Sequence, residues 1–276
     1  MNFQPNQPPA TAARAAAVIC LHSSASSARQ WASLQDSLTD GYRPIAPDLL
    51  GYGAERDWQH DRAHSLDDEA RAVESLIEVQ PDGVHLVGHS FGGAVALHVA
   101  LRKPGRVKSV ALYEPVLANL LQGNVGARAA FVEFAAVRIA VRRAVYSGRA
   151  EHAAHVFVDY WSGLGAWRAL PEKRQQAIAQ RMRKVDAEFD AIFHNVTRLS
   201  DYRKVSVPVL IMVGGATRPP PRAIADLLGT TLPDVRRQEI AEAGHLGPLT
   251  HAGEVNARIR AFLDAQESRA PLARAA

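Results

Sequence analysis

Cysteine is almost absent from this chain of 276 residues, in which Cys20 is the one thiol. A single cysteine cannot form an intramolecular disulfide, so the usual mark of an oxidising compartment is missing. The first 14 residues also lack the hydrophobic segment that follows a basic start in a secretory signal. We therefore expect a reduced, cytoplasmic protein.

Long apolar runs and common ligand motifs are missing as well. No run approaches the ~20 apolar residues of a membrane-spanning helix, so we expect no membrane span. No spacing of histidine, cysteine and carboxylate side chains suggests a metal, and no glycine-rich phosphate loop is present, so we expect no metal and no cofactor.

Positive charge is present without being concentrated. The formal net charge is +4, but the arginines are dispersed rather than gathered into one basic run, so no nucleic-acid partner is implied. A milder cluster contains Arg138, Arg142, Arg143 and Arg149. It is either a solvated helix face or a surface that attracts anionic substrates.

The chain has ample material for a core, because 47% of its residues are hydrophobic and only 22% are charged. Apolar runs predict strands at 15–21, 43–46, 84–87, 107–113, 207–213 and 235–240. Helical patterns lie between them, at 28–38, 65–81, 91–101, 223–228 and 255–262. This alternation predicts an α/β fold with a mostly parallel sheet.

Residues 117–204 break the alternation, because their periodicity is wholly helical. We interpret them as a helical cap inserted into an α/β core formed by 15–116 and 205–266. The segments 1–14 and 267–276 are expected to be flexible tails.

The most informative motif is Gly88-His89-Ser90-Phe91-Gly92-Gly93, directly after the predicted strand 84–87. Glycines two positions either side of Ser90 allow a sharp strand-to-helix turn that exposes a serine hydroxyl. The helix N-terminus at Ser90 also directs free N–H groups toward a developing oxyanion. The plainer alternative is a glycine-rich turn with a capping serine.

Further motifs occur in a set order around this turn. They are Leu21-His22-Ser23-Ser24 before Trp31, Asp48-Leu49-Leu50-Gly51-Tyr52-Gly53, and Ala243-Gly244-His245 after the last strand. With the glycine-flanked serine, they make residues 15–266 resemble the α/β-hydrolase superfamily. The resemblance is to the cap-bearing branch, which contains esterases, carbon-carbon bond hydrolases, epoxide hydrolases and dehalogenases.

The resemblance implies roles for individual residues. Ser90 stands where epoxide hydrolases and dehalogenases carry an aspartate, which implies acyl transfer to serine. His245 matches the general base, although an isolated histidine is more often structural. The backbone N–H groups of Phe91 and Ser24 match the oxyanion hole.

The acid of the triad is not at its usual place. This branch commonly carries an aspartate after the strand that corresponds to 207–213, but residues 214–221 contain no carboxylate. Glu114 follows the strand 107–113, and some members of the superfamily take the acid from that strand end. We therefore predict Glu114 as the acid, the alternative being a structural cap at the start of the inserted segment.

Three more residues are candidates for substrate binding. His22 could instead hydrogen-bond within its loop, and Ser23 stands where the family usually has glycine and could add a hydroxyl donor. Trp161 could line an apolar pocket or belong to the core of the cap. Asp48 is expected to support a turn rather than take part in chemistry.

These residues together predict a serine hydrolase that cleaves a carboxylic ester through a covalent acyl-enzyme. Its partner is a small-molecule substrate, and the sequence carries no signal for an oligomeric state. Carbon-carbon bond hydrolysis of diketone acids remains open, as does a small-ligand receptor that has lost hydrolysis. Lyase or perhydrolase chemistry is a further alternative.

Overall fold

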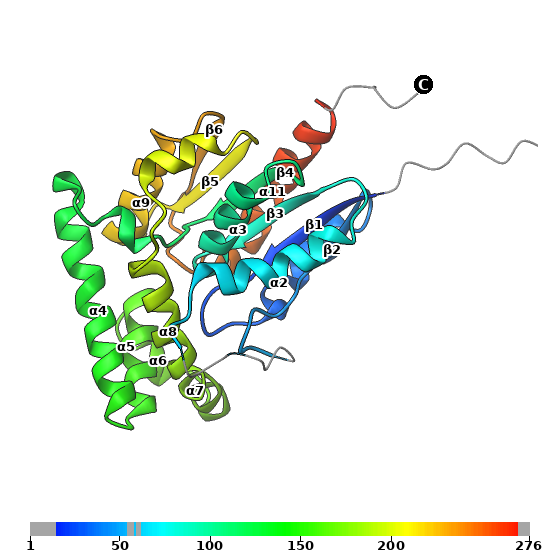
Figure 1. Ribbon diagram of the computed structural model, residues 1–276. Coiled ribbons are helices and arrows are strands. Elements are labelled where there is room, and N and C mark those ends of the chain that lie inside the picture. The colour runs from blue at the N-terminus through cyan, green and yellow to red at the C-terminus, as the bar shows by residue number, and fades with distance from the viewer. Residues whose placement is uncertain (1–14, 54–57, 59–61, 270–276) are drawn as a thin grey trace, which may run out of the picture.

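Six parallel strands form the central sheet in the order β2-β1-β3-β4-β5-β6 (Figure 1). The computed structural model describes residues 15–53, 58 and 62–269. The strands are β1 (Ala16–Leu21), β2 (Tyr42–Ile45), β3 (Val84–His89), β4 (Val107–Tyr113), β5 (Val209–Gly214) and β6 (Val235–Ile240). The sheet confirms the predicted α/β class, and its parallel pairing brings the carboxyl ends of all strands to one edge.

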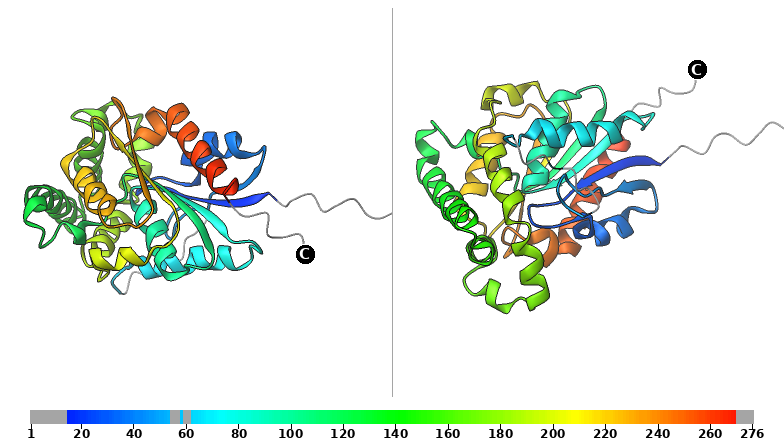
Figure 2. Two further views of the ribbon diagram at one scale, coloured as in Figure 1. Left: turned by 90° about the horizontal axis from the view of Figure 1, so that it is seen from above. Right: turned by 60° about the horizontal axis from the view of Figure 1, so that its bottom comes forward.

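Helices cover both faces of the sheet. The helices of the α/β layers are α1 (Ala32–Leu38), α2 (Leu66–Glu78), α3 (Phe91–Arg102), α9 (Pro219–Gly229), α10 (Gly247–Thr250) and α11 (Ala252–Glu267). Seen from above, α1 and α11 lie on one side of the sheet and α2 and α3 on the other (Figure 2). Each face has its own hydrophobic core, because alternate strand residues such as Ile19 and Cys20 point to opposite sides.

Helices also fill the chain between β4 and β5. They are α4 (Arg128–Tyr146), α5 (Ala150–Ser162), α6 (Ala166–Ala169), α7 (Glu172–Ala179) and α8 (Met182–Phe193). Figure 1 shows this group gathered on one side of the sheet. The division of the chain into core and cap at residues 117 and 204 stays a prediction. No helix in the described ranges combines the length and apolarity needed to cross a bilayer.

The predicted elements differ from the observed ones mainly at their ends. Residues 28–38 form a short 3-10 helix (Ala28–Trp31) followed by α1, rather than one continuous helix. The last helix is longer than the predicted 255–262 and includes Glu267, whose carboxylate accepts hydrogen bonds from Lys108 and His85. The predicted tail 1–14 lies outside the described residues, as do residues 270–276 of the predicted tail 267–276.

The turn between β3 and α3 requires glycine at two positions, because neighbouring backbone atoms leave no room there for a side chain. A Cβ on Gly88 would lie 2.5 Å from the carbonyl oxygen of Gly92. A Cβ on Gly92 would lie 2.4 Å from the carbonyl oxygens of Leu21 and His22. Real Cβ atoms do not approach backbone so closely. Glycine at 88 therefore lets the end of β3 lie against the start of α3, and glycine at 92 lets α3 pack against the end of β1.

Gly88→Ala is expected to lower the free energy of unfolding by about 1–3 kcal/mol, because backbone atoms rather than a flexible side chain must move to make room for the Cβ. Denaturant unfolding monitored by circular dichroism measures the effect. Gly105→Ala is the control, because a Cβ there has no atom within 4 Å and should change stability little. Equal stability of the two variants would contradict the packing argument.

Candidate active site

Ser90 lies at the sharp turn between β3 and α3 with an unusual backbone conformation. Its φ is 55° and its ψ is −117°, a region that residues with a side chain rarely adopt. A hydrogen bond from Ser90 N to Tyr113 O (3.0 Å) and another from Val116 N to Ser90 O (3.2 Å) hold it there. The turn presents the hydroxyl at the carboxyl edge of the sheet, and Ser90 is only 5% exposed.

A chain of hydrogen bonds connects Ser90 with His245 and Glu114. His245 Nε2 lies 2.9 Å from Ser90 Oγ, and His245 Nδ1 lies 2.7 Å from Glu114 Oε2. A carboxylate can only accept, so Nδ1 carries the ring proton and Nε2 is left to accept from the serine hydroxyl. This is the protonation pattern that a general base requires.

The second oxygen of Glu114 is fixed by the neighbouring strand. Gly214 N, at the end of β5, donates to Glu114 Oε1 at 2.8 Å. Glu114 is fully buried and has a φ of 44°. A Cβ on Gly214 would lie 2.1 Å from the carbonyl oxygen of Ala243, so the end of β5 has room for the Glu114 carboxylate but none for a side chain of its own.

Strained backbone is concentrated around these residues. Among the described non-glycine residues, positive φ occurs at Ala25, Ser90, Glu114 and Glu242. Ala25 follows Ser24, and Glu242 precedes His245 in the same turn. Such strain persists only where surrounding contacts enforce it, and it is commonest at functional sites.

A buried polar network joins the loop after β1 to the loop that carries His245. Ser23 N and Ser23 Oγ both donate to Gln30 Oε1, at 3.1 and 2.8 Å. Gln30 Nε2 donates to His89 Nδ1 (3.1 Å), and His89 Nε2 donates to the His245 carbonyl (2.8 Å). Burial, with the nearby His245 ring, holds the pKa of His89 well below its usual value, so the ring stays neutral.

Both ring nitrogens of His22 form hydrogen bonds with backbone atoms of neighbouring loops. Its Nδ1 donates to the Ser23 carbonyl at 2.8 Å, and its Nε2 accepts from Leu49 N at 3.0 Å. Burial lowers its pKa, and the side chain is fully buried. Both ring nitrogens are therefore occupied within the loops, and no hydrogen-bonding capacity is left for a substrate.

Two small chambers meet at Ser90. The Glu188 chamber has a volume of about 20 Å³ and is lined by Ser24, Ser90, Phe91, Val116, Phe134, Phe157, Trp161, Val185, Glu188, Phe189 and Ile192. The His245 chamber, of about 130 Å³, is lined by Ser23, Ser24, Ala25, Ser26, Ser90, Phe157, Val158, Trp161, Ser162, Leu170, Arg174, Ile178, His245, Leu246 and Leu249. Helices α5 and α8 contribute the apolar walls.

Trp161 lies between the two chambers and stacks on the imidazole of His245. The ring centroids are 3.8 Å apart with an interplanar angle of 25°. Trp161 also packs edge-on against Phe134. The structure thus brings Trp161 and the predicted oxyanion residues Ser24 and Phe91 around Ser90, and Ser23 lines the His245 chamber while its hydroxyl bonds to Gln30.

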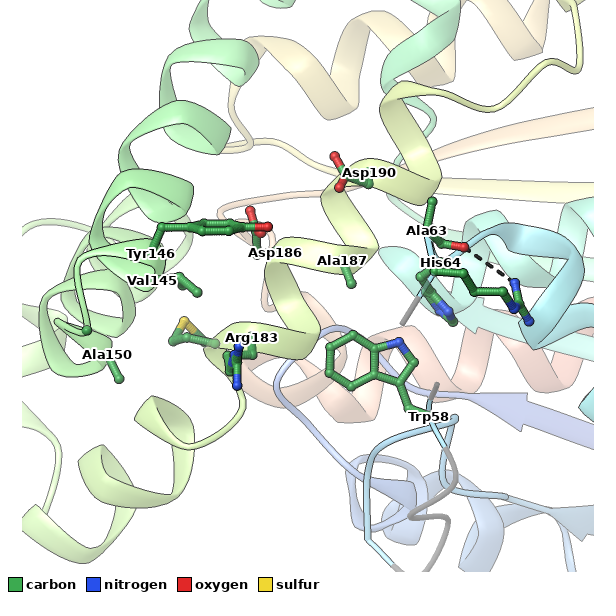
Figure 3. Close-up of a pocket in the computed structure, with 13 residues that line it drawn as sticks. Trp58, Ala63, His64, Val145, Tyr146, Ala150, Arg183, Asp186, Ala187 and Asp190 are labelled. Atoms are coloured by element: carbon green, nitrogen blue, oxygen red, sulfur yellow. Dashed lines mark hydrogen bonds between the residues drawn. The ribbon is translucent and has the colours of Figure 1, made fainter. Parts of the chain in front are cut away.

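A larger pocket, of about 680 Å³, lies elsewhere between α4, α8 and the segment around His64 (Figure 3). Its walls include Trp58, His64, Tyr146, Arg183 and Asp186. None of the hydrogen-bonded chain from Ser90 to Glu114 lines it. The described ranges also contain no group of three histidine, cysteine or carboxylate side chains arranged to hold a metal.

Two residues of this region, Gln30 and Glu188, are not among the residues predicted from the sequence. Gln30 lies in a short helix with no motif around it, and its network becomes visible only when three loops meet. Glu188 lies on α8 one turn after Lys184, a spacing that suggests an ordinary surface ion pair. The side chains of Gln30 and Glu188 are both buried.

Gln30→Met should destabilise the protein by about 2–3 kcal/mol, because it leaves the Ser23 N–H and the His89 ring without partners in a buried site. Urea unfolding measures the effect. Gln176→Met is the matched control, since Gln176 is exposed and bonds only to Glu172 on its own helix. If Gln30→Met lowers the free energy of unfolding no more than Gln176→Met does, the hydrogen bonds of Gln30 contribute nothing to stability.

Parts of the chain are similar in sequence to known hydrolases. Lipase LipV of Mycobacterium tuberculosis is 39% identical over 105 residues, which cover 37% of this chain and 38% of that protein. The 2-hydroxymuconate semialdehyde hydrolase of a Pseudomonas strain is 37% identical over 101 residues, which cover 34% and 35%. The chain thus matches little more than a third of the length of these curated relatives.

The fold similarity extends over nearly the whole chain. MenH from S. aureus has a TM-score of 0.73 at 20% identity and covers 91% of this chain and 94% of its own. The enol-lactonase from Burkholderia xenovorans has a TM-score of 0.72 at 16% identity, with coverage of 91% and 92%. Residues 18–258 match the alpha/beta hydrolase family. The chain therefore belongs to the alpha/beta hydrolase family.

Proposed function

We propose that this protein is a serine hydrolase that cleaves a carboxylic ester with Ser90 as nucleophile, His245 as base and Glu114 as the orienting acid. The observation that carries the proposal is the continuous hydrogen-bonded chain Ser90–His245–Glu114 at 2.9 and 2.7 Å. Relatives that are hydrolases support the general class of reaction.

The first half of the reaction forms an acyl-enzyme. Ser90 Oγ attacks the ester carbonyl carbon while His245 Nε2 takes the hydroxyl proton. The imidazolium is stabilised by the carboxylate of Glu114. Negative charge develops on the carbonyl oxygen, where the N–H groups of Phe91 and Ser24 donate to it; Phe91 is the first residue of α3, whose first-turn N–H groups lack acceptors within the helix.

The acyl-enzyme forms when His245 gives its proton to the leaving alcohol as the carbon-oxygen bond of the ester breaks. In the second half, His245 takes a proton from a water that attacks the acyl carbon, and returns it to Ser90 Oγ as the bond between the acyl group and Ser90 breaks and the acid leaves. Because His245 lines only one of the two chambers, the leaving alcohol belongs in the His245 chamber.

Carbon-carbon bond hydrolysis of a diketone acid is the second candidate, favoured by Arg174 in the wall of the His245 chamber. A guanidinium there offers a counter-charge to a substrate carboxylate. Arg138 and Arg142 of α4 are less suited to bind a substrate carboxylate, because they already form ion pairs. Arg138 pairs with Asp190, and Arg142 pairs with both Asp186 and Asp190. A panel of acyl esters of graded chain length, beside one diketone-acid substrate, separates the two activities.

A fluorophosphonate probe should label the protein covalently at Ser90, because the probe needs a serine that a neighbouring base activates. Intact-mass spectrometry measures the adduct, and Ser90→Ala should abolish it. Folded wild-type protein that remains unlabelled would instead favour a small-ligand receptor.

Glu114→Gln should lower kcat for ester hydrolysis by about 10²–10⁴-fold, because an amide can present its NH₂ group to His245 and disturb the tautomer that accepts from Ser90. Steady-state kinetics and thermal unfolding are measured together. Glu242→Gln is the control, since Glu242 is exposed and lies in the same turn as His245. Near-normal turnover of folded Glu114→Gln would remove Glu114 from the triad.

A further inference from the structure

Arg181, the residue before α8, contacts the loop that carries one of the proposed oxyanion donors. Its Nη1 donates to the carbonyl oxygens of Ala25 (2.9 Å) and Ser26 (3.1 Å). Arg181 and Ala25 lie 156 positions apart in the chain. A hydrogen bond from a charged donor is stronger than one between neutral groups. The helices between β4 and β5 therefore hold the loop after β1 by a strong contact to its backbone.

The contacted loop contains a β-turn with a strained residue. Ser26 N donates to Ser23 O at 3.3 Å, which places Ser24 and Ala25 at the centre of the turn. Ala25 has a φ of 57°, at a position where a positive φ favours glycine. Alanine keeps this conformation only while surrounding contacts enforce it. The turn therefore depends on bonds to other parts of the molecule.

A second contact holds Ala25 through its N–H group. Ala25 N donates to the Tyr52 hydroxyl at 3.0 Å. Burial and the negative charge of Glu188 raise the pKa of Tyr52 well above its usual value, so the hydroxyl keeps its proton and is hydrogen-bonded to Glu188. Glu188 in turn forms a salt bridge of 3.0 Å with Lys184, one turn earlier on α8. The Ala25 carbonyl is thus bonded to Arg181, and the Ala25 N–H is connected to α8 through Tyr52.

Ser24, which precedes Ala25, would contribute a backbone N–H group to the reaction. The position of such a donor depends on the loop conformation alone, because no side-chain rotamer can correct it. An oxyanion donor must lie about 2.7–3.1 Å from the developing charge. Phe91, the other proposed donor, belongs to α3, whereas Ser24 lies in a turn outside any helix or strand. The Ser24 donor is therefore the one that needs support from other segments.

We propose that Arg181 is a positioning residue for the oxyanion hole. It holds the turn at Ala25 so that the Ser24 N–H stays directed at the carbonyl oxygen of the bound ester. The inference rests on the proposed function, because it presupposes an oxyanion on that carbonyl. It makes stabilisation of the oxyanion depend on the helices between β4 and β5, and not only on the strand ends that carry Ser90 and His245.

Arg181→Met removes the charged donor and keeps a long, unbranched side chain. With 4-nitrophenyl butyrate, it should lower kcat by about 10–100-fold and change KM by less than about 3-fold, because a displaced oxyanion donor weakens binding of the transition state rather than of the substrate. Arg181→Lys keeps the positive charge and N–H donors, so it should recover part of the loss. Arg168→Met, which changes an exposed arginine of α6, is the matched control and should leave kcat unchanged.

Two ketones separate a displaced oxyanion donor from general damage to the site. Ser90 Oγ adds to the carbonyl carbon of 1,1,1-trifluorohexan-2-one, the serine proton passes to His245, and the ketone oxygen becomes an oxyanion. Hexan-2-one binds as the unreacted ketone. Arg181→Met should raise the Ki of the trifluoroketone by about the factor by which it lowers kcat/KM, and it should leave the Ki of hexan-2-one nearly unchanged. A purely structural role of Arg181 would weaken binding of both ketones.

A folded Arg181→Met variant with kcat within about twofold of the wild type overturns the proposal, as does an equal loss of affinity for the two ketones. Thermal unfolding shows whether each variant is folded. If Arg181→Met is not, the neutral, polar variant Arg181→Gln takes its place in both measurements. If neither variant folds, Arg181 is required for folding, and the positioning role is refuted.

Fluorophosphonate labelling of the wild type separates this inference from the proposed function. A labelled, active enzyme whose kcat does not depend on Arg181 refutes only the role of Arg181. An unlabelled, inactive wild type refutes the proposed function itself.

Discussion

The hydrogen bond between Glu114 and His245 is the interaction on which the rest of the site depends. It joins residues 131 positions apart in the chain. It forms because β4, β5 and β6 are parallel neighbours, so the loops after them meet at one edge of the sheet. Gly214, between the two partners, contributes the N–H that fixes the other oxygen of Glu114. Three adjacent strand ends therefore define the orientation of one imidazole ring.

Glycine packing and buried polar contacts both stabilise the loops at this edge. The β3–α3 turn approaches the backbone of β1 so closely that no side chain fits at Gly92. Beside it, Gln30 and His89 link the loop after β1 to the His245 carbonyl. These contacts allow a strained Ser90 backbone to persist, because neighbouring atoms leave it no relaxed alternative.

The helices between β4 and β5 provide the apolar side of the site. Trp161 stacks on the imidazole of His245 and lines both chambers. On α8, Lys184 holds Glu188 at the wall of the smaller chamber. A buried carboxylate bonded to Lys184 therefore lies in the wall of an otherwise apolar chamber beside Ser90.

The sequence by itself determined the α/β class, the strand positions to within about two residues, and the Ser90 turn, because these follow from local patterns of apolar residues and glycine. Chain order and the missing carboxylate at 214–221 were enough to nominate His245 and Glu114. Only the tertiary structure decided that Glu114 reaches His245, that His22 has no free nitrogen, and that Glu188 is buried beside Ser90. Those facts depend on contacts between segments far apart in the chain, for which a single sequence carries no distance.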